Sequence, residues 1–287
     1  MRRLTIAVII ATKGRPKVAA QLIRHLGAQT RRPDRVILSV ANKADAPAVA
    51  GVEVVTGPVG LAVQRNTGLR AVAEMDIAVF YDDDFVPAPG ALDAIEQLFA
   101  ARPEIGGATG HVAADGASAD EISVETAENI CRQLHLSPPT LAERQVIGLY
   151  GCNMAIRLSA AANLWFDEAL PLYGWQEDLD YGARLSARGT IIKTTAFSGV
   201  HRGVKSAKPA ERGLGYAQIA NPAYLMRRGD IPVGYLLRLM ARNFVANHLS
   251  VFIRSPSVDR LGRAKGNWRA LLDLALGRLS PGRAVDL

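Results

Sequence analysis

Three consecutive carboxylates, Asp82, Asp83 and Asp84, follow the apolar run of residues 77–81. Carboxylates at the mouth of an apolar strand repel one another and resist the loss of water, so they require positive charge among them. Mg²⁺ and Mn²⁺ take oxygen ligands and are usually shared with phosphate, which makes a divalent cation carrying a phosphorylated ligand the natural candidate. The alternative is a solvated acidic turn. Because side chains alternate along a strand, we expect Asp82 and Asp84 on one side and Asp83 on the other.

The first two hundred residues, which must position these carboxylates, alternate between apolar β-rich runs and helix-like segments. We expect strands at residues 4–11, 35–40, 52–56 and 77–81, and helices at residues 17–28, 60–73 and 89–101. This alternation predicts a Rossmann-like α/β fold, with a mostly parallel central sheet and helices on both faces. In such sheets, ligands bind beyond the carboxyl ends of the strands. Residues 12–16 and the aspartate triplet both fall at such ends, which supports a site there.

The pattern is interrupted in residues 113–147. This stretch lacks periodicity and contains a polar tract and consecutive prolines, so we expect an irregular segment. Residues 150–157 return to the apolar pattern, and residues 172–185 predict an amphipathic helix with a glycine-rich entry. A strand is expected at residues 191–194, and residues 199–201 are expected at another strand exit.

Composition excludes several classes of protein. The chain has 287 residues, 49% of them hydrophobic, which is enough for a core of one domain or one and a half. Cys131 and Cys152 have no His or Cys at ligand spacing, which excludes a disulfide framework and a zinc site and fits a reducing cytosol. Residues 1–11 resemble a signal peptide only superficially, and we expect a first strand there. No apolar run reaches about 18 residues, so no membrane span is predicted.

Charge divides the chain. Residues 1–200 contain 19 Lys and Arg against 22 Asp and Glu, a net charge of −3, whereas residues 201–287 contain 15 against 5, a net charge of +10. We therefore expect a catalytic body in residues 1–203 and a basic helical C-terminal extension in residues 204–287. Nucleic acid, an anionic membrane and phosphorylated substrates could each explain the basic charge.

Five stretches, in this order and spacing, resemble the inverting family 2 glycosyltransferases of the GT-A fold: residues 8–16, 60–69, 80–87, 151–157 and 174–185. The resemblance covers roughly residues 4–203. It implies a hexosyltransferase-type enzyme that moves a sugar from a nucleotide-sugar donor, usually UDP-linked, to an acceptor hydroxyl. It also implies a divalent cation, Mn²⁺ or Mg²⁺, and inversion at the anomeric carbon.

The resemblance assigns donor contacts to the end of the first strand. Backbone amides and side chains of Ala11, Thr12 and Arg15 could hold the base and diphosphate of a nucleotide, although Arg15 could also be an ordinary solvated arginine. Asn42 lies where relatives place an acidic residue that reads uracil. Here residues 39–42 depart from the usual acidic pair, which leaves the base of the donor open.

A second set of donor and metal residues follows. Arg65 lies in the first turns of a helix, near its positive end, and could pair with phosphate or with the aspartates, or be a surface arginine. The resemblance places Asp82 and Asp83 on the donor side and assigns the cation to Asp84. His201, at a later strand exit, matches a position that supplies a further metal ligand, and its alternative is a structural role.

The resemblance assigns the catalytic base to Asp178. An acceptor hydroxyl must lose its proton as it attacks the anomeric carbon, and a carboxylate suffices because the transition state is oxocarbenium-like. Glu177 and Trp175 are then expected to shape the acceptor side. The alternative for two acids at a helix start is stabilisation of the helix dipole.

The basic extension predicts two helices, at residues 235–254 and 265–279. Each carries an apolar stripe beside arginines, with Leu237, Met240, Phe244 and Val251 on the first and Trp268, Leu271, Leu272, Ala275 and Leu279 on the second. Basic amphipathic helices of this kind can lie in an anionic membrane interface, or they can pack on the catalytic body. No nucleic-acid-binding module is recognisable, so we expect no nucleic acid partner. Family habits and the basic charge suggest a cytoplasmic protein, peripheral on the inner face of the plasma membrane, with a saccharide or lipid-linked acceptor in bacterial polysaccharide synthesis.

Two other functions stay open. A sugar-1-phosphate nucleotidyltransferase also uses a Rossmann-like sheet and acidic metal ligands, but it would want a glycine-richer loop than residues 11–15 and leaves residues 175–182 unexplained. A non-catalytic nucleotide-sugar-binding module could keep the nucleotide pocket without needing Asp178.

Overall fold

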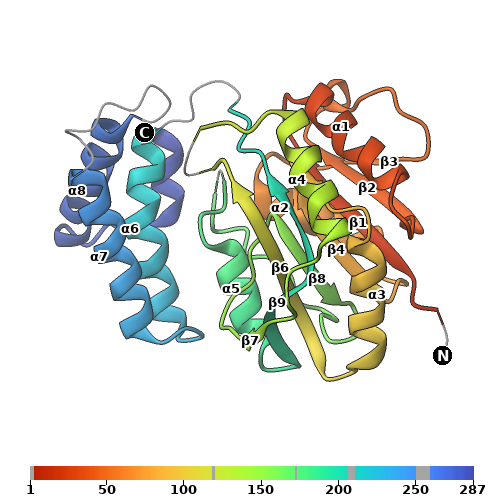
Figure 1. Ribbon diagram of the computed structural model, residues 1–287. Helices are drawn as coiled ribbons and strands as arrows, with labels where there is room; N and C mark the ends of the chain where they lie inside the picture. The colour runs from red at the N-terminus through yellow and green to blue at the C-terminus, as the bar shows by residue number, and fades with distance from the viewer. Residues whose placement is uncertain (1–2, 118–119, 172, 206–210, 250–258) are drawn as a thin grey trace.

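The chain folds around one central sheet with helices on both faces, and a group of helices from the C-terminal third lies at its side (Figure 1). The computed structural model describes residues 3–117, 120–171, 173–205, 211–249 and 259–287.

Nine strands form the sheet, in the order β3-β2-β1-β4-β8-β6-β9-β5, with β7 paired to β9. They are β1 (Ile6–Thr12), β2 (Arg35–Val40), β3 (Glu53–Thr56), β4 (Ile77–Asp82), β5 (Phe85–Pro87), β6 (Ile105–Asp115), β7 (Glu143–Gln145), β8 (Asn153–Arg157) and β9 (Thr190–His201). The helices are α1 (Pro16–Gly27), α2 (Leu61–Arg70), α3 (Ala91–Ala101), α4 (Val124–Leu136), α5 (Glu177–Leu185), α6 (Glu211–Arg228), α7 (Val233–Leu249) and α8 (Arg260–Ala275), with 3-10 helices η1 (Lys43–Asp45) and η3 (Pro281–Asp286).

Six of the nine strands point in one direction. Strands β1 to β4 are mutually parallel, and β6 and β9 share their direction because β8 runs antiparallel to both β4 and β6. Strands β5 and β7 run antiparallel to β9. The predicted α/β fold with a mostly parallel sheet is therefore confirmed, and the carboxyl ends of β1, β2 and β4 meet at one edge.

Strand β1 is buried on both faces, which explains its unbroken apolar sequence. Ile6, Val8 and Ile10 belong to the core that includes side chains of α1 and α3. Ala7 and Ile9 belong to the opposite core, with side chains of α2 and α5. The central strands are thus packed between two apolar layers, which fix the position of their carboxyl ends.

The expectation of an irregular segment at residues 113–147 is wrong. The segment contains the end of β6, the helix α4 and the short strand β7. Helix α4 begins regularly, since the Ser123 hydroxyl accepts a hydrogen bond from the amide of Thr126 at 3.1 Å. Its buried face consists of only Ala127 and Cys131, so the helical period is weak in the sequence.

Helix α6 lies in a stretch for which the sequence analysis predicts no helix. Its glycines and Pro222 conceal it, and the glycines have a packing reason. A methyl group on Gly215 would overlap the carbonyl oxygen of Arg263 in α8, and one on Gly266 would overlap the carbonyl oxygen of Arg212 in α6. The two helices therefore approach backbone to backbone, which only glycine permits.

The remaining two expected helices are present with shifted bounds. Residues 235–254 correspond to α7, whose expected end at 250–254 lies outside the described residues, and residues 265–279 correspond to α8. We call α6, α7, α8 and η3 the helical extension. Among the described residues, no helix combines the length and the apolar character needed to cross a bilayer.

Polar networks hold the helical extension together. Asp273 is fully buried and accepts hydrogen bonds from Tyr216, Arg278 and Arg283 at 2.8–3.0 Å. These bonds keep the pKa of the Asp273 carboxyl at about 2, against the opposing effect of burial. The side-chain amide of Asn247 in α7 donates to Gln218 in α6, at 2.6 Å, and to Asn267 in α8, at 2.9 Å. Because these buried polar groups have hydrogen-bond partners only in this packing, they specify one arrangement of the helices.

Replacing Gly215 with alanine should destabilise the helical extension. The added methyl group would meet main chain that cannot swing away, so overpacking should lower the free energy of unfolding by about 1–3 kcal/mol, measured by chemical denaturation. Gly234→Ala in α7 is the matched control, because a methyl group there meets no described atom within 4 Å. It should leave stability unchanged or raise it by up to about 1 kcal/mol. Equal stability of the two variants would contradict the close α6–α8 contact.

Candidate metal centre

The end of β4 and the end of β9 are brought together by β5. Asp82 is the last residue of β4, and Asp83 and Asp84 form the turn into β5, where both are buried. Strand β5 pairs with β9 so that Phe85 lies opposite His201. This register places a histidine more than a hundred residues distant in sequence beside the aspartate triplet.

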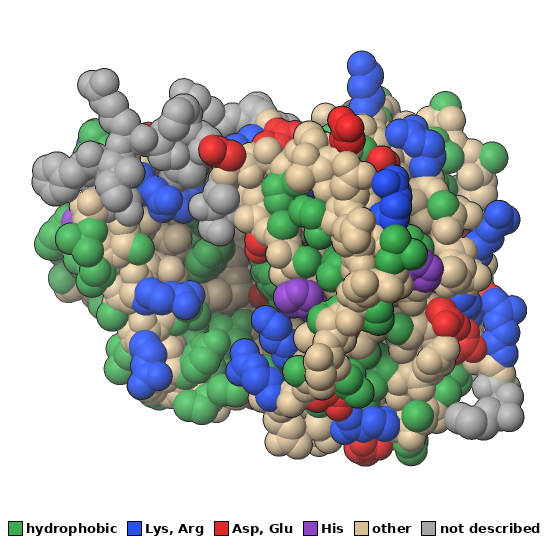
Figure 2. Space-filling view, in the orientation of Figure 1, with side chains coloured by type: hydrophobic (Ala, Val, Ile, Leu, Met, Phe, Trp, Pro, Cys, Tyr) green, Lys and Arg blue, Asp and Glu red, His purple; other side chains and the backbone are tan. Residues whose placement is uncertain are grey.

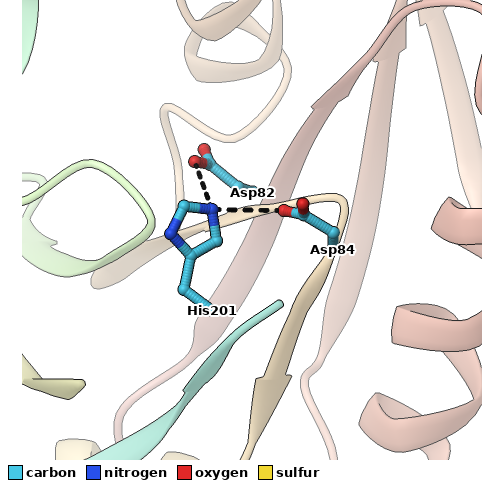
Figure 3. Close-up of side chains that lie close together, drawn as sticks. All are labelled: Asp82, Asp84 and His201. Carbon is cyan, nitrogen blue, oxygen red and sulfur yellow. Dashed lines mark ion pairs between the residues drawn. The ribbon is translucent and has the colours of Figure 1, made fainter. Parts of the chain in front are cut away.

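Asp82, Asp84 and His201 form a compact group of potential metal ligands (Figure 3). One ligand atom from each lies within 4.8 Å of the others. The Nε2 atom of His201 lies 3.3 Å from an oxygen of Asp84 and 3.7 Å from an oxygen of Asp82. As expected from strand alternation, Asp83 is not part of this group. Two carboxylates and an imidazole suit a divalent cation such as Mn²⁺.

The electrostatics of this group favour a cation. The Oδ1 atom of Asp84 is buried and has no hydrogen-bond partner among the described residues, although His201 Nε2 faces it. Burial opposes a charged imidazole, but Asp115 and Asp84 outweigh it, so the pKa of His201 is raised above its usual range. The residues therefore fit a divalent cation, which would supply the positive charge that these carboxylates need.

Asp115, at the end of β6, orients the histidine and was not identified from the sequence. Its Oδ1 atom lies 2.9 Å from Nδ1 of His201, while its Oδ2 atom accepts a hydrogen bond from the Tyr150 hydroxyl at 2.5 Å. A carboxylate on Nδ1 holds a metal-binding histidine with Nε2 directed at the metal. No sequence signal marks Asp115, because it lies at the edge of a stretch interpreted as irregular.

Asp83 turns away from this group and binds the loop after β1. The Thr12 hydroxyl donates to it at 2.5 Å, and the guanidinium of Arg15 bonds it through Nε, at 3.0 Å, and through Nη2. Burial raises the pKa of Asp83 to about 6, with Arg15 opposing the rise. Arg15 also lies 3.7 Å from Asp84, so this loop is held by two of the three aspartates.

Arg65 connects the metal group to the start of α5. It is buried, bonds Glu177, and lies 3.2 Å from Asp82 Oδ1 and 3.0 Å from the carbonyl oxygen of Gly151. Burial opposes its charge, but Glu177 and Asp82 outweigh the burial and raise the pKa of Arg65. Arg65 is therefore not a surface arginine. Of the two partners expected for Arg65, phosphate or the aspartates, the structure shows a contact with one aspartate, Asp82.

Asp178 lies at the start of α5, one residue after Glu177. Its two oxygens accept hydrogen bonds from the amides of Gly151, at 2.7 Å, and Leu179, at 2.8 Å. Burial raises the pKa of the Asp178 carboxyl, with Arg65 opposing the rise. The geometry accommodates both expected roles, because the carboxylate binds backbone at the helix start and remains half-buried near the buried guanidinium of Arg65.

The other expected site residues lie on either side of the metal group. Ala11 and Asn42 lie along the sheet edge, and Trp175 lies near the helical extension. Ala11 pairs in register with Asp82, which places it at the site edge of β1. Asn42 is exposed after β2 and begins η1 by accepting a hydrogen bond from Ala44 at 3.0 Å, so it lies farther along the same sheet edge. Trp175 is half-buried next to α6, whose Asn221 donates to its carbonyl oxygen at 2.8 Å.

Gln176 is another site feature that the sequence did not reveal. It is buried between Trp175 and Glu177 and adopts a left-handed backbone conformation, with φ of 75°, that is unfavourable for a residue with a side chain. Within the described part of the chain, neither its amide nitrogen nor its amide oxygen has a hydrogen-bond partner. Figure 2 shows the surface hollowed between the helical extension and the sheet-bearing part of the molecule.

Comparison with known proteins gives no matching family model and no matching curated protein. Solved structures do match. Residues 1–349 of TarS from S. aureus superpose with a TM-score of 0.57 at 13% identity, covering 98% of this chain and 82% of that chain. The same part of TarS in complex with UDP-GlcNAc gives 0.56 at 14% identity, over 98% and 83% of the two chains. The mannosyltransferase PcManGT from Pyrobaculum calidifontis, in complex with GDP-Man and Mn²⁺, gives 0.52 at 14% identity, over 99% and 86%.

The chain has a GT-A fold. The fold expected from the five sequence stretches is thereby confirmed. The superpositions extend over almost the whole chain, including the helical extension. The roles of individual site residues rest on the contacts described above.

Replacing Asp84 with alanine should abolish Mn²⁺ binding. The variant loses a buried carboxylate of the group, and the remaining pair of ligands cannot hold a divalent cation firmly. Titration of free Mn²⁺ by electron paramagnetic resonance measures the affinity without any nucleotide or activity. Asp230→Ala, in the turn between α6 and α7, removes an exposed carboxylate and should bind Mn²⁺ as the unaltered protein does. Equal affinity of the two variants would exclude Asp84 as a ligand.

Asp115→Asn should weaken Mn²⁺ binding by about 10- to 100-fold while leaving the ligands in place. The amide keeps the shape of the side chain but no longer holds the His201 ring through a charged hydrogen bond. The same resonance titration applies. Tyr150→Phe removes the hydroxyl on the far oxygen of Asp115 and should have a smaller effect in the same direction. Unchanged Mn²⁺ affinity in Asp115→Asn would mean that other contacts orient His201.

Proposed function

We propose that the protein is a metal-dependent inverting glycosyltransferase that transfers a sugar from a nucleotide sugar, UDP-linked by preference, to an acceptor hydroxyl. The observation that carries the proposal is the cluster in which the possible metal ligands Asp82, Asp84 and His201 adjoin the buried pair of Arg65 and Glu177. This cluster lies at the carboxyl edge of the sheet, where such folds bind their ligands. The matched structures that contain UDP-GlcNAc or GDP-Man and Mn²⁺ support a nucleotide-sugar donor.

The site residues are given roles by their contacts. Asp84 and His201 would hold the cation, which when bound neutralises the charge of the donor diphosphate. The residues proposed to line the donor are Ala11, Thr12, Arg15, Asn42, Arg65, Asp82 and Asp83. Their arrangement along the ends of β1, β2 and β4 supports an extended ligand that crosses these strands.

Asp178 is proposed as the base, with Trp175 and Glu177 on the acceptor side. The acceptor oxygen forms a bond to the anomeric carbon as the bond from that carbon to the diphosphate oxygen breaks. The bonding electrons leave with the diphosphate, and the hydroxyl proton passes to Asp178. Attack from the face opposite the leaving group inverts the anomeric carbon. The raised pKa of Asp178 supports this role, because a base with a higher pKa accepts a proton more readily.

We further propose that residues 1–203 form the transferase domain and residues 204–287 the basic extension. The last strand ends at His201, and α6 begins at Glu211. A saccharide or a lipid-linked saccharide, as in bacterial polysaccharide synthesis, is the proposed acceptor. The alternatives, a sugar-1-phosphate nucleotidyltransferase or a binding module, differ in their products. Incubation with labelled UDP-sugars and Mn²⁺ distinguishes them, since only a glycosyltransferase transfers the sugar or slowly hydrolyses the donor.

Asp178→Asn should reduce sugar transfer, or donor hydrolysis in which water replaces the acceptor, by about 100-fold or more. The amide keeps the shape but accepts the proton poorly. The affinity for UDP in Mn²⁺, measured by calorimetry, should stay near that of the unaltered protein, because the residue is assigned to the acceptor side. Asp230→Asn is the matched exposed control. Turnover within a few-fold of the unaltered protein would assign Asp178 to stabilisation of the helix start. Asp180 or Glu177 would then be the next candidate, and each is already paired with an arginine, Arg184 and Arg65 respectively.

A further inference from the structure

Large apolar side chains are exposed on the two outer helices of the extension. Half of the large hydrophobic residues that are exposed in the described part of the chain, nine of eighteen, lie on α7 and α8. Trp268, an expected member of the apolar stripe of α8, is 59% exposed. The buried face of α8 consists instead of small and polar residues, among them Gly266, Asn267 and Ala270. Of the expected stripe, Trp268, Leu272 and Ala275 are therefore exposed, whereas Leu279 is buried and Leu271 half-buried in the core of the helical extension.

These side chains form one surface, which we call the outer apolar face: Leu237, Val245 and Leu249 of α7 with Leu261, Trp268 and Leu272 of α8. Successive members are spaced by eight and four residues on α7 and by seven and four on α8, which keeps each set on one side of its helix. The Trp268 ring packs edge-on against Phe244, with centroids 5.6 Å apart, and thereby joins the two helices. Figure 2 shows apolar side chains along the outer edge of the helical extension, with Lys and Arg among them.

The charge exposed on the two helices that carry this face has a single sign, although Asp259, which caps α8, is exposed beside Leu261. Arg238 and Arg242 of α7 and Lys265 of α8 are exposed. Helix α7 contains no acidic residue, and the only acidic residue of α8 is Asp273, which is fully buried and bonded to arginines. Neither helix thus presents an exposed carboxylate.

We propose that the outer apolar face docks on an anionic phospholipid bilayer. Apolar side chains with a central tryptophan suit the boundary between acyl chains and headgroups, and the flanking cations suit anionic headgroups. A second copy of this chain is a poorer occupant, because a two-fold contact through this face would bring like charges together. Docking goes beyond the proposed transfer reaction and would place the enzyme beside lipid-linked molecules.

Vesicle sedimentation tests the docking with the full chain and without donor or metal, so its outcome is independent of the proposed reaction. The protein should sediment with vesicles of phosphatidylglycerol and phosphatidylcholine but not with vesicles of phosphatidylcholine alone. Binding should weaken by more than tenfold when the salt concentration is raised from about 50 to about 500 mM. This change shortens the electrostatic screening length roughly threefold and so weakens the attraction to the anionic headgroups. Bromine-labelled acyl chains should quench tryptophan fluorescence in the unaltered protein and much less in Trp268→Phe.

Paired variants separate the face from the overall charge. Arg238→Glu/Arg242→Glu and, separately, Leu237→Glu/Leu272→Glu should each reduce vesicle binding by at least tenfold. Arg132→Glu/Arg144→Glu changes the same number of charges at exposed positions of α4 and β7 and should bind as the unaltered protein does. Circular dichroism confirms folding of each variant. Absence of binding to anionic vesicles would overturn the proposal, as would equal loss in the control variant. A concentration-dependent dimer that Leu237→Glu/Leu272→Glu dissociates would assign the face to a second copy instead.

Discussion

Three carboxylates crowd at the end of β4, and the geometry of the site depends on the cations that hold them there. Each carboxylate receives a cation from a different element: Arg65 of α2 for Asp82, Arg15 of the loop after β1 for Asp83, and His201 of β9 for Asp84. Removing carboxylates from water is costly, so such a cluster is stable only when the fold delivers these partners. The pairing of β5 with β9 brings His201 to the aspartates, and α2 brings Arg65.

Because each aspartate binds a different cationic side chain, the three aspartates have different roles in the site. Arg15 and Thr12 bind Asp83, which secures the loop that begins α1. Asp82 and Asp84 remain directed at His201, and together the three side chains could hold a divalent cation. Arg65 reaches past Asp82 to Glu177 and so couples the start of α5 to the metal group. A chain of alternating charges thus runs from the β1 loop to the neighbour of the proposed base, and altering one member would disturb those on either side.

The sequence reveals the parts of this arrangement that have local signals. The triplet after a buried strand, the helix with Arg65 and the acidic start of α5 could each be placed from spacing, and β2 lies at its expected residues. Asp115 and Gln176 could not be placed, because their importance arises from strands and backbone angles that only the tertiary structure sets. Helix α6 was concealed because its glycines weaken local helix propensity while permitting close packing on α8.

Helix α6 also shows why the helical extension is more than an appendage. One side of it meets α8 through Gly215, while Asn221, on another side, donates to the carbonyl oxygen of Trp175. Tyr224 adds a hydrogen bond to Asp167 of the sheet-bearing part, at 2.8 Å. The same helix therefore supports the outer helices and holds the loop that precedes Glu177. Because packed helices transmit displacement with little compression, the position of the outer helices and that of Trp175 are mechanically linked through α6.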